Sequence, residues 1–364
     1  MSTDADAWRE DGLSLVPVAA DPQTGADFAS DQDVRWCPGC GDFGVLAAFK
    51  QFLPSLGIRR ENTVFISGIG CSSRFPYYLN TYGMHSVHGR APTIATGLAI
   101  TRPDLSIWVI TGDGDALSIG GNHLIHALRR NVNIKIILFN NRIYGLTKGQ
   151  YSPTSTPGTV TKSSPAGSLD HAFNAVSLAL GAEASFVARA IDLDRPGLTD
   201  VLAAAARHRG SAVVEILQDC PVFNAGAMDT LRDADSSTHV VLRLEHGAPM
   251  RFGAPAADGL GTRAVVREGF GMRIEDAANV SPTDVLRHDE TDLEQAFALS
   301  RLIAPTLDPT PIGIIRRVRR QTYDDAIRQP DRRHLHEPPA DLQHLLDGEE
   351  FWDVGDISHR ASPR

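Results

Sequence analysis

Short apolar runs alternate with helix-like segments between residues 60 and 220, and this alternation is the main structural signal in the chain. The apolar runs predict four strands, at 64–67, 106–111, 134–139 and 211–217. Segments of helical character are found at 93–100, 122–130, 171–180 and 198–207. Strands that alternate with helices form βαβ units, so the pattern predicts an α/β fold with a doubly wound, mostly parallel sheet covered on both faces.

Outside this region the pattern weakens, and the chain is expected to have four parts. Residues 1–33 are polar and acidic and predict a flexible N-terminal extension that could contain a short ordered stretch, whereas 34–230 form the domain with the alternating pattern. Residues 231–330 predict a C-terminal extension that packs on the domain or on a partner, with a helix at 293–303 and a strand at 311–318. Residues 331–364 are rich in His, Arg, Asp and Pro, which is typical of an exposed polar tail.

Composition adds limits on partners and location. Hydrophobic residues make up 42% and charged residues 22%, as in ordinary soluble globular proteins. The net charge of −9 argues against a nucleic-acid-binding surface. No apolar run approaches the roughly 20 residues that cross a bilayer, and the acidic first residues do not resemble a signal peptide. We therefore expect a cytoplasmic protein with neither a nucleic acid nor a membrane as partner.

Residues with chemical potential follow the predicted strands. Each of four strand ends is followed by glycine, cysteine, aspartate or asparagine, at 70–71, 112–115, 140–141 and 220. In open α/β sheets ligands bind outside the carboxyl ends of the strands. The four positions therefore predict a single site at one edge of the sheet.

The sequence Gly-Asp-Gly-Asp at 112–115, with Asn141 after the next strand, has the chemistry of a diphosphate site. Its glycines permit a tight turn and a close approach of the backbone to phosphate. Oxygens of Asp113, Asn141 and the backbone carbonyl of Ile143 are hard ligands that suit Mg²⁺. A turn without a ligand is the alternative, but the preceding strand, the following helix and the spacing of the asparagines favour thiamine diphosphate.

Four cysteines form a second group, consisting of Cys37, Cys40, Cys71 and Cys220. The first two have the chelating C-x-x-C spacing, and the other two are isolated in the sequence. Four thiolates suit either a structural Zn²⁺ or a [4Fe–4S] cluster. Because a zinc ribbon normally uses two local C-x-x-C pairs, the scatter favours one cluster at the sheet edge. Zinc and four inert core thiols remain the alternatives.

Several motifs occur together in an order that is typical of one enzyme family. They are Trp-Cys-Pro-Gly-Cys-Gly-Asp at 36–42, Gly-Ile-Gly-Cys-Ser at 68–72, His-Gly-Arg-Ala at 88–91, Gly-Asp-Gly-Asp at 112–115, Gly-Gly-Asn-His at 120–123, and the run from Tyr to Thr at 144–154. Over about residues 34–330 the chain resembles the beta subunits of CoA-dependent 2-oxoacid:ferredoxin oxidoreductases. Within this family it is most similar to the actinobacterial 2-oxoglutarate oxidoreductases.

This resemblance implies a thiamine diphosphate-binding fold and a definite set of site residues. It implies that the [4Fe–4S] ligands are Cys37, Cys40, Cys71 and Cys220, and that the Mg²⁺ ligands are Asp113, Asn141 and the carbonyl of Ile143. It places around thiamine diphosphate the residues Ile69, Gly70, Cys71, Ser72, His88, Gly112, Gly114, Asp115, Gly145 and Leu146. The activity it implies is oxidative decarboxylation of 2-oxoglutarate to succinyl-CoA and CO₂, with one-electron transfer through the cluster to ferredoxin.

The resemblance also implies that the chain works with partners. In this family the glutamate that activates the aminopyrimidine ring belongs to an alpha subunit with a pyrimidine-binding domain, and the sequence contains no recognisable domain of that kind. Coenzyme A, the 2-oxoacid and ferredoxin complete the expected partners. Arg74 and Lys148 are candidates for binding the substrate carboxylate, although each could be a solvated charge or part of a salt bridge.

Two alternatives to this function remain open. The same chemistry could act on pyruvate or another 2-oxoacid, because the motifs do not select the substrate. A non-catalytic interaction protein stabilised by zinc would also use four cysteines on a doubly wound sheet.

Overall fold

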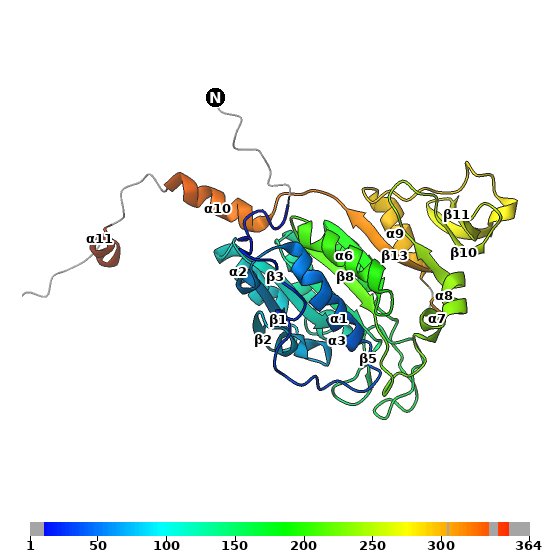
Figure 1. Cartoon of the computed structure of the whole chain (residues 1–364), viewed down its shortest axis with the longest axis horizontal. Coiled ribbons are helices and arrows are strands. Elements are labelled where there is room, and N and C mark those ends of the chain that lie inside the picture. The colour runs from blue at the N-terminus through cyan, green and yellow to red at the C-terminus, as the bar shows by residue number, and fades with distance from the viewer. Residues whose placement is uncertain (1–10, 304–305, 335–340, 349–364) are drawn as a thin grey trace, which may run out of the picture.

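The computed structural model of the protein describes residues 11–303, 306–334 and 341–348. An eight-stranded sheet with the order β2-β1-β3-β4-β8-β7-β13-β9 forms its centre (Figure 1). All neighbouring pairs are parallel except β13 with β7, so the predicted mostly parallel sheet is confirmed. The strands are β1 Thr63–Ser67, β2 Tyr82–His85, β3 Ser106–Gly112, β4 Lys135–Asn140, β7 Phe186–Ile191, β8 Ala212–Leu217, β9 Val241–Arg243 and β13 Thr310–Arg317.

Both faces of the sheet are buried because successive side chains of each strand point to opposite sides. In β3, Ile107 and Val109 belong to one apolar cluster, whereas Trp108 and Ile110 belong to the other. One face is covered by α1 Asp42–Phe52 and α6 Arg195–Arg207. The other is covered by α2 Ala91–Thr101, α4 Gly121–Arg129, α5 Ala175–Gly181 and α9 Leu293–Leu302. These layers leave the carboxyl ends of the central strands open to a ligand.

The N-terminal segment is more ordered than predicted. Within residues 11–33, Phe28 is fully buried and contributes to the core beneath α1. Val18 and Ala29 form isolated bridges with Ile58 and Leu79. The ordered stretch of the extension is therefore longer than expected and covers 11–33, because scattered apolar side chains suffice to dock it. Residues 1–10 lie outside the described residues.

The region after residue 230 contributes to the main sheet as well as covering it. Strands β9 and β13 extend the sheet, and the predicted strand and helix in this region are confirmed as β13 and α9. A separate three-stranded sheet contains β10 Arg251–Pro255, β11 Gly261–Glu268 and β12 Gly271–Asp276, at the right of Figure 1. The short helices of this region are α7 Asp229–Arg232 and α8 Ala234–Val240.

The polar tail predicted for 331–364 lies mostly outside the described residues. Its described parts are the end of α10 Tyr323–His334 and the short helix α11 Leu342–Asp347, in which Leu342 and Leu346 are exposed. In the described part of the chain, every helix is too short or too polar to span a membrane.

Candidate functional site

A cleft lies at the carboxyl ends of β1, β3 and β4, where the sequence predicted the site. It is bordered by the helical turn η3 Ser72–Tyr78, the short helix α3 Asp113–Leu117 and the two-stranded hairpin of β5 Ile143–Tyr144 and β6 Gln150–Tyr151. Its lining consists of Asp42, Ile69, Gly70, Cys71, Ser72, His88, Gly112, Asp113, Gly114, Asp115, Phe139, Asn141, Ile143, Tyr144, Gly145, Leu146 and Thr147. The residues expected around thiamine diphosphate and Mg²⁺ are therefore gathered in one cleft.

Asp113 is a buried carboxylate held by two hydroxyl groups. It begins α3 directly after β3, and Ser152 and Thr154 each donate a hydrogen bond of 2.5 Å to its Oδ2. Burial raises the pKa of Asp113 to about 6, although the two hydroxyls lower it. A carboxylate that is costly to bury without a counter-charge suits a bound cation.

The loop after β4 presents oxygens from the opposite side of the cleft. The side-chain oxygen of Asn141 accepts a hydrogen bond from the backbone N–H of Ile143, and its carbonyl accepts one from Asn224. Arg142 between them has a φ of 57°, the left-handed conformation, which reverses the chain within one residue. This turn places Asn141 and Ile143 beside Asp113 in the lining of the same cleft.

Asp115 connects three segments rather than facing the cleft with a free oxygen. Its Oδ1 accepts hydrogen bonds from the backbone N–H groups of Ile69 and Gly89, and its Oδ2 accepts one from Thr111. His88 Nδ1 lies 2.7 Å from the same Oδ1 but has no hydrogen-bond partner among the described residues, and His88 also lines the cleft. Asp115 therefore joins the loops after β1 and β2 to the end of β3.

Two glycines bring the backbone against neighbouring groups. A Cβ on Gly114 would overlap the ring of Tyr144, whose hydroxyl donates a hydrogen bond to the Gly114 carbonyl. A Cβ on Gly145 would lie 3.5 Å from Cys71 Sγ and 3.6 Å from Cys220 Sγ. The side of Gly145 on which a Cβ would lie therefore faces two of the cysteine sulfurs.

The cysteines approach from three elements of the chain. Cys37 is exposed and Cys40 partly buried in a turn that Gly39 permits with a φ of 81°. Burial raises the pKa of the Cys71 thiol to about 12, and the charges of Asp42 and Cys220 raise it further. Burial and the nearby charge of Asp42 also raise the pKa of Cys40. Thiols in this environment would lose their protons to a bound metal rather than to water.

The four sulfurs are not packed around one point. Among the residues that the structure describes, no group of three or more His, Cys, Asp or Glu side chains is arranged to hold a single metal ion. The cysteines are nevertheless near enough to act on one another: Cys71 and Cys220 help raise the pKa of Cys40, and Cys37 and Cys220 help raise the pKa of Cys71. A [4Fe–4S] cluster takes one thiolate at each of four iron atoms, so its ligands need not meet at one ion.

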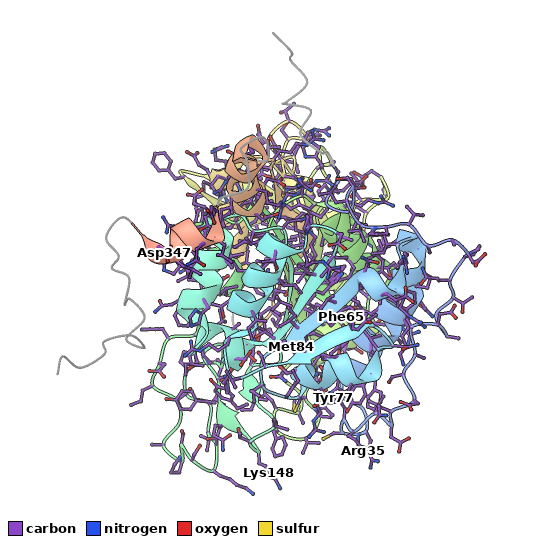
Figure 2. The ribbon with its side chains drawn as sticks, turned by 90° about the vertical axis from the view of Figure 1, so that its left-hand side faces the viewer. Arg35, Phe65, Tyr77, Met84, Lys148 and Asp347 are labelled. Carbon is purple, nitrogen blue, oxygen red and sulfur yellow. The ribbon has the colours of Figure 1, made fainter. Side chains whose placement is uncertain are left out.

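The two cations proposed to bind substrate lie outside the cleft lining. Arg74 donates a hydrogen bond to the Arg35 carbonyl, which holds its guanidinium near the protein surface. Lys148 is exposed in the hairpin loop with a φ of 77° and points outward at the lower edge of Figure 2. Their role in binding the substrate carboxylate stays a prediction.

Other residues of the site were not identified from the sequence. Ser152 and Thr154 lie in the motif at 144–154, but nothing in that motif indicated which side chains contact Asp113. Asp42 lines the cleft and is nearly fully buried, and burial raises its pKa to about 7. Its position directly after the C-x-x-C-Gly turn was the available signal.

The residues present fit the expected groups. Asp113 offers a buried, desolvated carboxylate, and the turn at Asn141 offers amide and carbonyl oxygens, which is the donor set that Mg²⁺ prefers. Gly112 at the start of α3 lines the cleft without a side chain, which leaves its backbone open to a diphosphate, whereas the Tyr144 ring fills the space beside Gly114. The thiols of Cys71 and Cys220 lie next to the same loop and offer ligands for a cluster.

Known proteins share this fold and these motifs. Residues 68–216 match the family model of the C-terminal TPP binding domain of thiamine pyrophosphate enzymes. The 2-oxoglutarate oxidoreductase subunit KorB of Mycobacterium tuberculosis is 61% identical over 344 residues, which cover 93% of this chain and 91% of that protein. Subunit beta of 2-oxoacid:ferredoxin oxidoreductase 1 from Aeropyrum pernix is 46% identical over 199 residues, covering 55% of this chain and 63% of that protein.

A solved structure extends the similarity to three dimensions. The 2-oxoglutarate:ferredoxin oxidoreductase of Magnetococcus marinus, solved with 2-oxoglutarate, coenzyme A and succinyl-CoA bound, superposes with a TM-score of 0.72 at 32% sequence identity. The superposition covers 91% of this chain and 98% of that one. The similarity therefore includes the region after residue 230 as well as the cleft.

Proposed function

The chain belongs to the beta subunits of the 2-oxoacid:ferredoxin oxidoreductases, and from this premise we propose its reaction. It is the thiamine diphosphate-binding subunit of an enzyme that converts 2-oxoglutarate and coenzyme A to succinyl-CoA and CO₂. Two electrons leave one at a time through a [4Fe–4S] cluster to ferredoxin. The observation that carries this proposal is the position of Gly145, which lines the cleft with Asp113 and on which a Cβ would lie 3.5 Å from Cys71 Sγ and 3.6 Å from Cys220 Sγ.

The residues of this chain would divide the work between two groups. Asp113, Asn141 and the Ile143 carbonyl would hold Mg²⁺ and through it the diphosphate, while Cys37, Cys40, Cys71 and Cys220 would hold the cluster. Thiamine diphosphate supplies, when bound, the carbon nucleophile and the electron sink for decarboxylation. Asp115 holds the loops at Ile69 and Gly89, and Tyr144 packs against Gly114, so these walls of the cleft are fixed before a ligand enters.

A turnover assay tests the proposed reaction. The chain is co-expressed with its partner subunit, purified without oxygen, and given 2-oxoglutarate, coenzyme A and ferredoxin. We expect ferredoxin reduction that requires both 2-oxoglutarate and coenzyme A, in a brown protein with broad absorbance near 400 nm. Faster turnover of pyruvate would contradict the substrate assignment. A colourless protein with one Zn²⁺ per chain would contradict the reaction itself.

The edge strand β2 is the surface on which we propose that the partner subunit docks. Tyr82 and Met84 on this strand are 65% and 49% exposed, and Tyr77 and Val87 beside it are 54% and 66% exposed. Figure 2 faces this edge and shows Tyr77 and Met84 on it. An exposed apolar edge strand is a template for pairing or packing with another chain. His88, which lines the cleft, follows β2 closely, so a subunit docked here would reach the cleft. We propose that it supplies the pyrimidine-binding domain.

Replacing Met84 with arginine is expected to weaken association with the partner subunit by at least about tenfold, because a charge would be buried in an apolar interface. Sedimentation or calorimetric titration of the two subunits measures this. Phe270→Arg is the matched control, since Phe270 is fully exposed on the distant β11–β12 hairpin. Equal affinities of the two variants would contradict docking at β2.

A further inference from the structure

Gln218 contacts one of the cysteine sulfurs. It directly follows β8, and its side chain is 1% exposed. Its Nε2 donates a hydrogen bond of 3.2 Å to Cys40 Sγ and another of 2.9 Å to the carbonyl of Asp219. A buried amide therefore faces a sulfur that we assign to the cluster.

The orientation of this amide is fixed by its neighbours. Both groups at Nε2 are acceptors, so turning the amide over would bring Oε1 against a carbonyl oxygen and a sulfur. Oε1 itself has no hydrogen-bond partner among the residues that the structure describes, which is a costly arrangement for a buried acceptor. The nitrogen is thus directed at Cys40 even though the oxygen is left unpaired.

The backbone is also shaped for this contact. A Cβ on Gly41 would overlap the Asp192 carboxylate and lie 2.8 Å from Cγ of Gln218. The N–H of Gly41 donates to the Asp219 carbonyl, and the N–H of Gln218 donates to the Asn140 carbonyl. The C-x-x-C turn and the end of β8 are therefore held together at the place where the amide meets the sulfur.

The surroundings of the sulfur are acidic. Asp42 and Asp192 are 2% exposed and Asp219 is 7% exposed. Arg232 pairs with Asp192, but Oδ1 of Asp42 and Oδ1 of Asp219 have no hydrogen-bond partner among the described residues. Negative charge near an iron–sulfur cluster opposes its reduction, whereas a hydrogen bond to a ligating sulfur favours it.

We propose that Gln218 raises the reduction potential of the cluster by donating a hydrogen bond to the Cys40 sulfur, against the acidic groups around it. The inference rests on the proposed function, because it requires the cluster. In the step concerned, one electron enters the cluster and the electron donor is oxidised by one electron. Gln218 gains or loses no proton; its N–H stabilises the additional negative charge on the sulfur. It is a positioning residue, since it acts through Cys40.

Gln218→Leu tests this inference in the complete enzyme complex. The measurement is the midpoint potential of the cluster, followed by electron paramagnetic resonance in an anaerobic redox titration. We expect the ratio of reduced to oxidised cluster at a given potential to fall about tenfold, which is 59 mV for a one-electron couple. Gln218→Asn, in which the amide is one methylene shorter, is expected to shift the potential in the same direction. The asparagine variant replaces the leucine variant in this test if the latter fails to assemble.

The matched control is Gln51→Leu, the same substitution on an exposed residue near the far end of α1. Iron content and thiamine diphosphate affinity are measured alongside, and we expect both to remain at the wild-type level. Midpoint potentials equal to that of the control, in variants that retain their iron, would overturn the inference and leave the proposed function standing. A wild-type complex in which this chain binds no cluster would overturn the proposed function and the inference with it.

Discussion

Replacing Asp113 with alanine is expected to weaken the binding of Mg²⁺–thiamine diphosphate by more than about 100-fold, the upper end of what loss of an outer-shell partner costs a metal site. The variant loses the buried carboxylate of the cleft, which accepts hydrogen bonds from Ser152 and Thr154; Thr154 can still donate to Asn140 Oδ1. Calorimetric titration of the assembled complex with thiamine diphosphate in excess Mg²⁺ measures the affinity. Iron content is expected to remain unchanged, because the cysteines approach from other elements.

A graded series separates a ligand role of Asp113 from a structural one. Ser152→Ala removes one hydrogen bond to the carboxylate and is expected to weaken binding about 10-fold, less than Asp113→Ala does. Asp200→Ala, which removes an exposed carboxylate from α6, is the control and is expected to have no effect. If Asp113→Ala bound thiamine diphosphate as tightly as the control, the assignment of Asp113 as a metal ligand would be wrong.

The position of the cleft could be predicted because it depends on local patterns. Apolar runs marked β1, β3, β4 and β8, and the residues that follow parallel strands meet at one edge of the sheet. The residues at 112–115 were informative because each has a specific role. Glycine permits a tight turn, and aspartate offers an oxygen ligand to the metal ion that binds phosphate. The chemistry of these motifs can be predicted from their residue types and spacing alone.

Elements that depend on distant partners could not be predicted in the same way. Strand β7 contains Arg189, which interrupts the apolar run that would identify a buried strand. In the sheet its guanidinium lies opposite Glu215 of β8, with Nε 2.7 Å from Oε2, so the charge is paired. Strand β2 is exposed along its whole length and therefore lacks the apolar alternation that marks a strand.

Helix α1 was missed for a different reason. Val45, Leu46, Phe49 and Phe52 have helical spacing and are all buried, so the signal was present. The preceding glycines and the C-x-x-C motif drew the interpretation toward a metal-binding turn, and the turn and the helix are in fact adjacent. The contacts of Ser152 with Asp113 and of Gln218 with Cys40 could not be predicted for a third reason. Each joins segments that are far apart in the chain, and nothing in the sequence indicates that they meet.

The arrangement of the site explains why one chain would hold both groups. Gly145 lies in the loop that follows the proposed Mg²⁺ ligands, and a Cβ on it would lie 3.5 Å from Cys71 Sγ and 3.6 Å from Cys220 Sγ. The two sulfurs therefore lie beside that loop, and a side chain larger than a methyl group at 145 would crowd them. Short separation favours transfer of single electrons, which a non-oxidative decarboxylase would not need. We therefore expect thiamine diphosphate and the cluster to bind independently of each other, and turnover to require both.

Cys220→Ser is expected to remove the cluster, lowering the iron bound by this chain by roughly half or more and bleaching the absorbance near 400 nm. A serine hydroxyl is a poor substitute for a thiolate, and Cys220 is the ligand that we propose is contributed by the loop after β8. Iron analysis and the visible spectrum of the anaerobic complex measure the loss. Val222→Ser, an exposed position on the same loop, is the control. Unchanged iron content in Cys220→Ser would refute the role of this cysteine.

Comparing Cys220→Ser with Asp113→Ala tests whether the two sites bind their groups independently of each other. Cys220→Ser is expected to bind thiamine diphosphate as the wild type does, because Cys220 is not among the residues that line the cleft with Asp113 and Asn141. Asp113→Ala is expected to retain iron, and both variants are expected to lose reduction of ferredoxin. Loss of both groups in either variant would mean that the loop with Gly145 folds only around a complete site. Reduction of ferredoxin by a variant that has lost its iron would show that the reaction does not require the cluster.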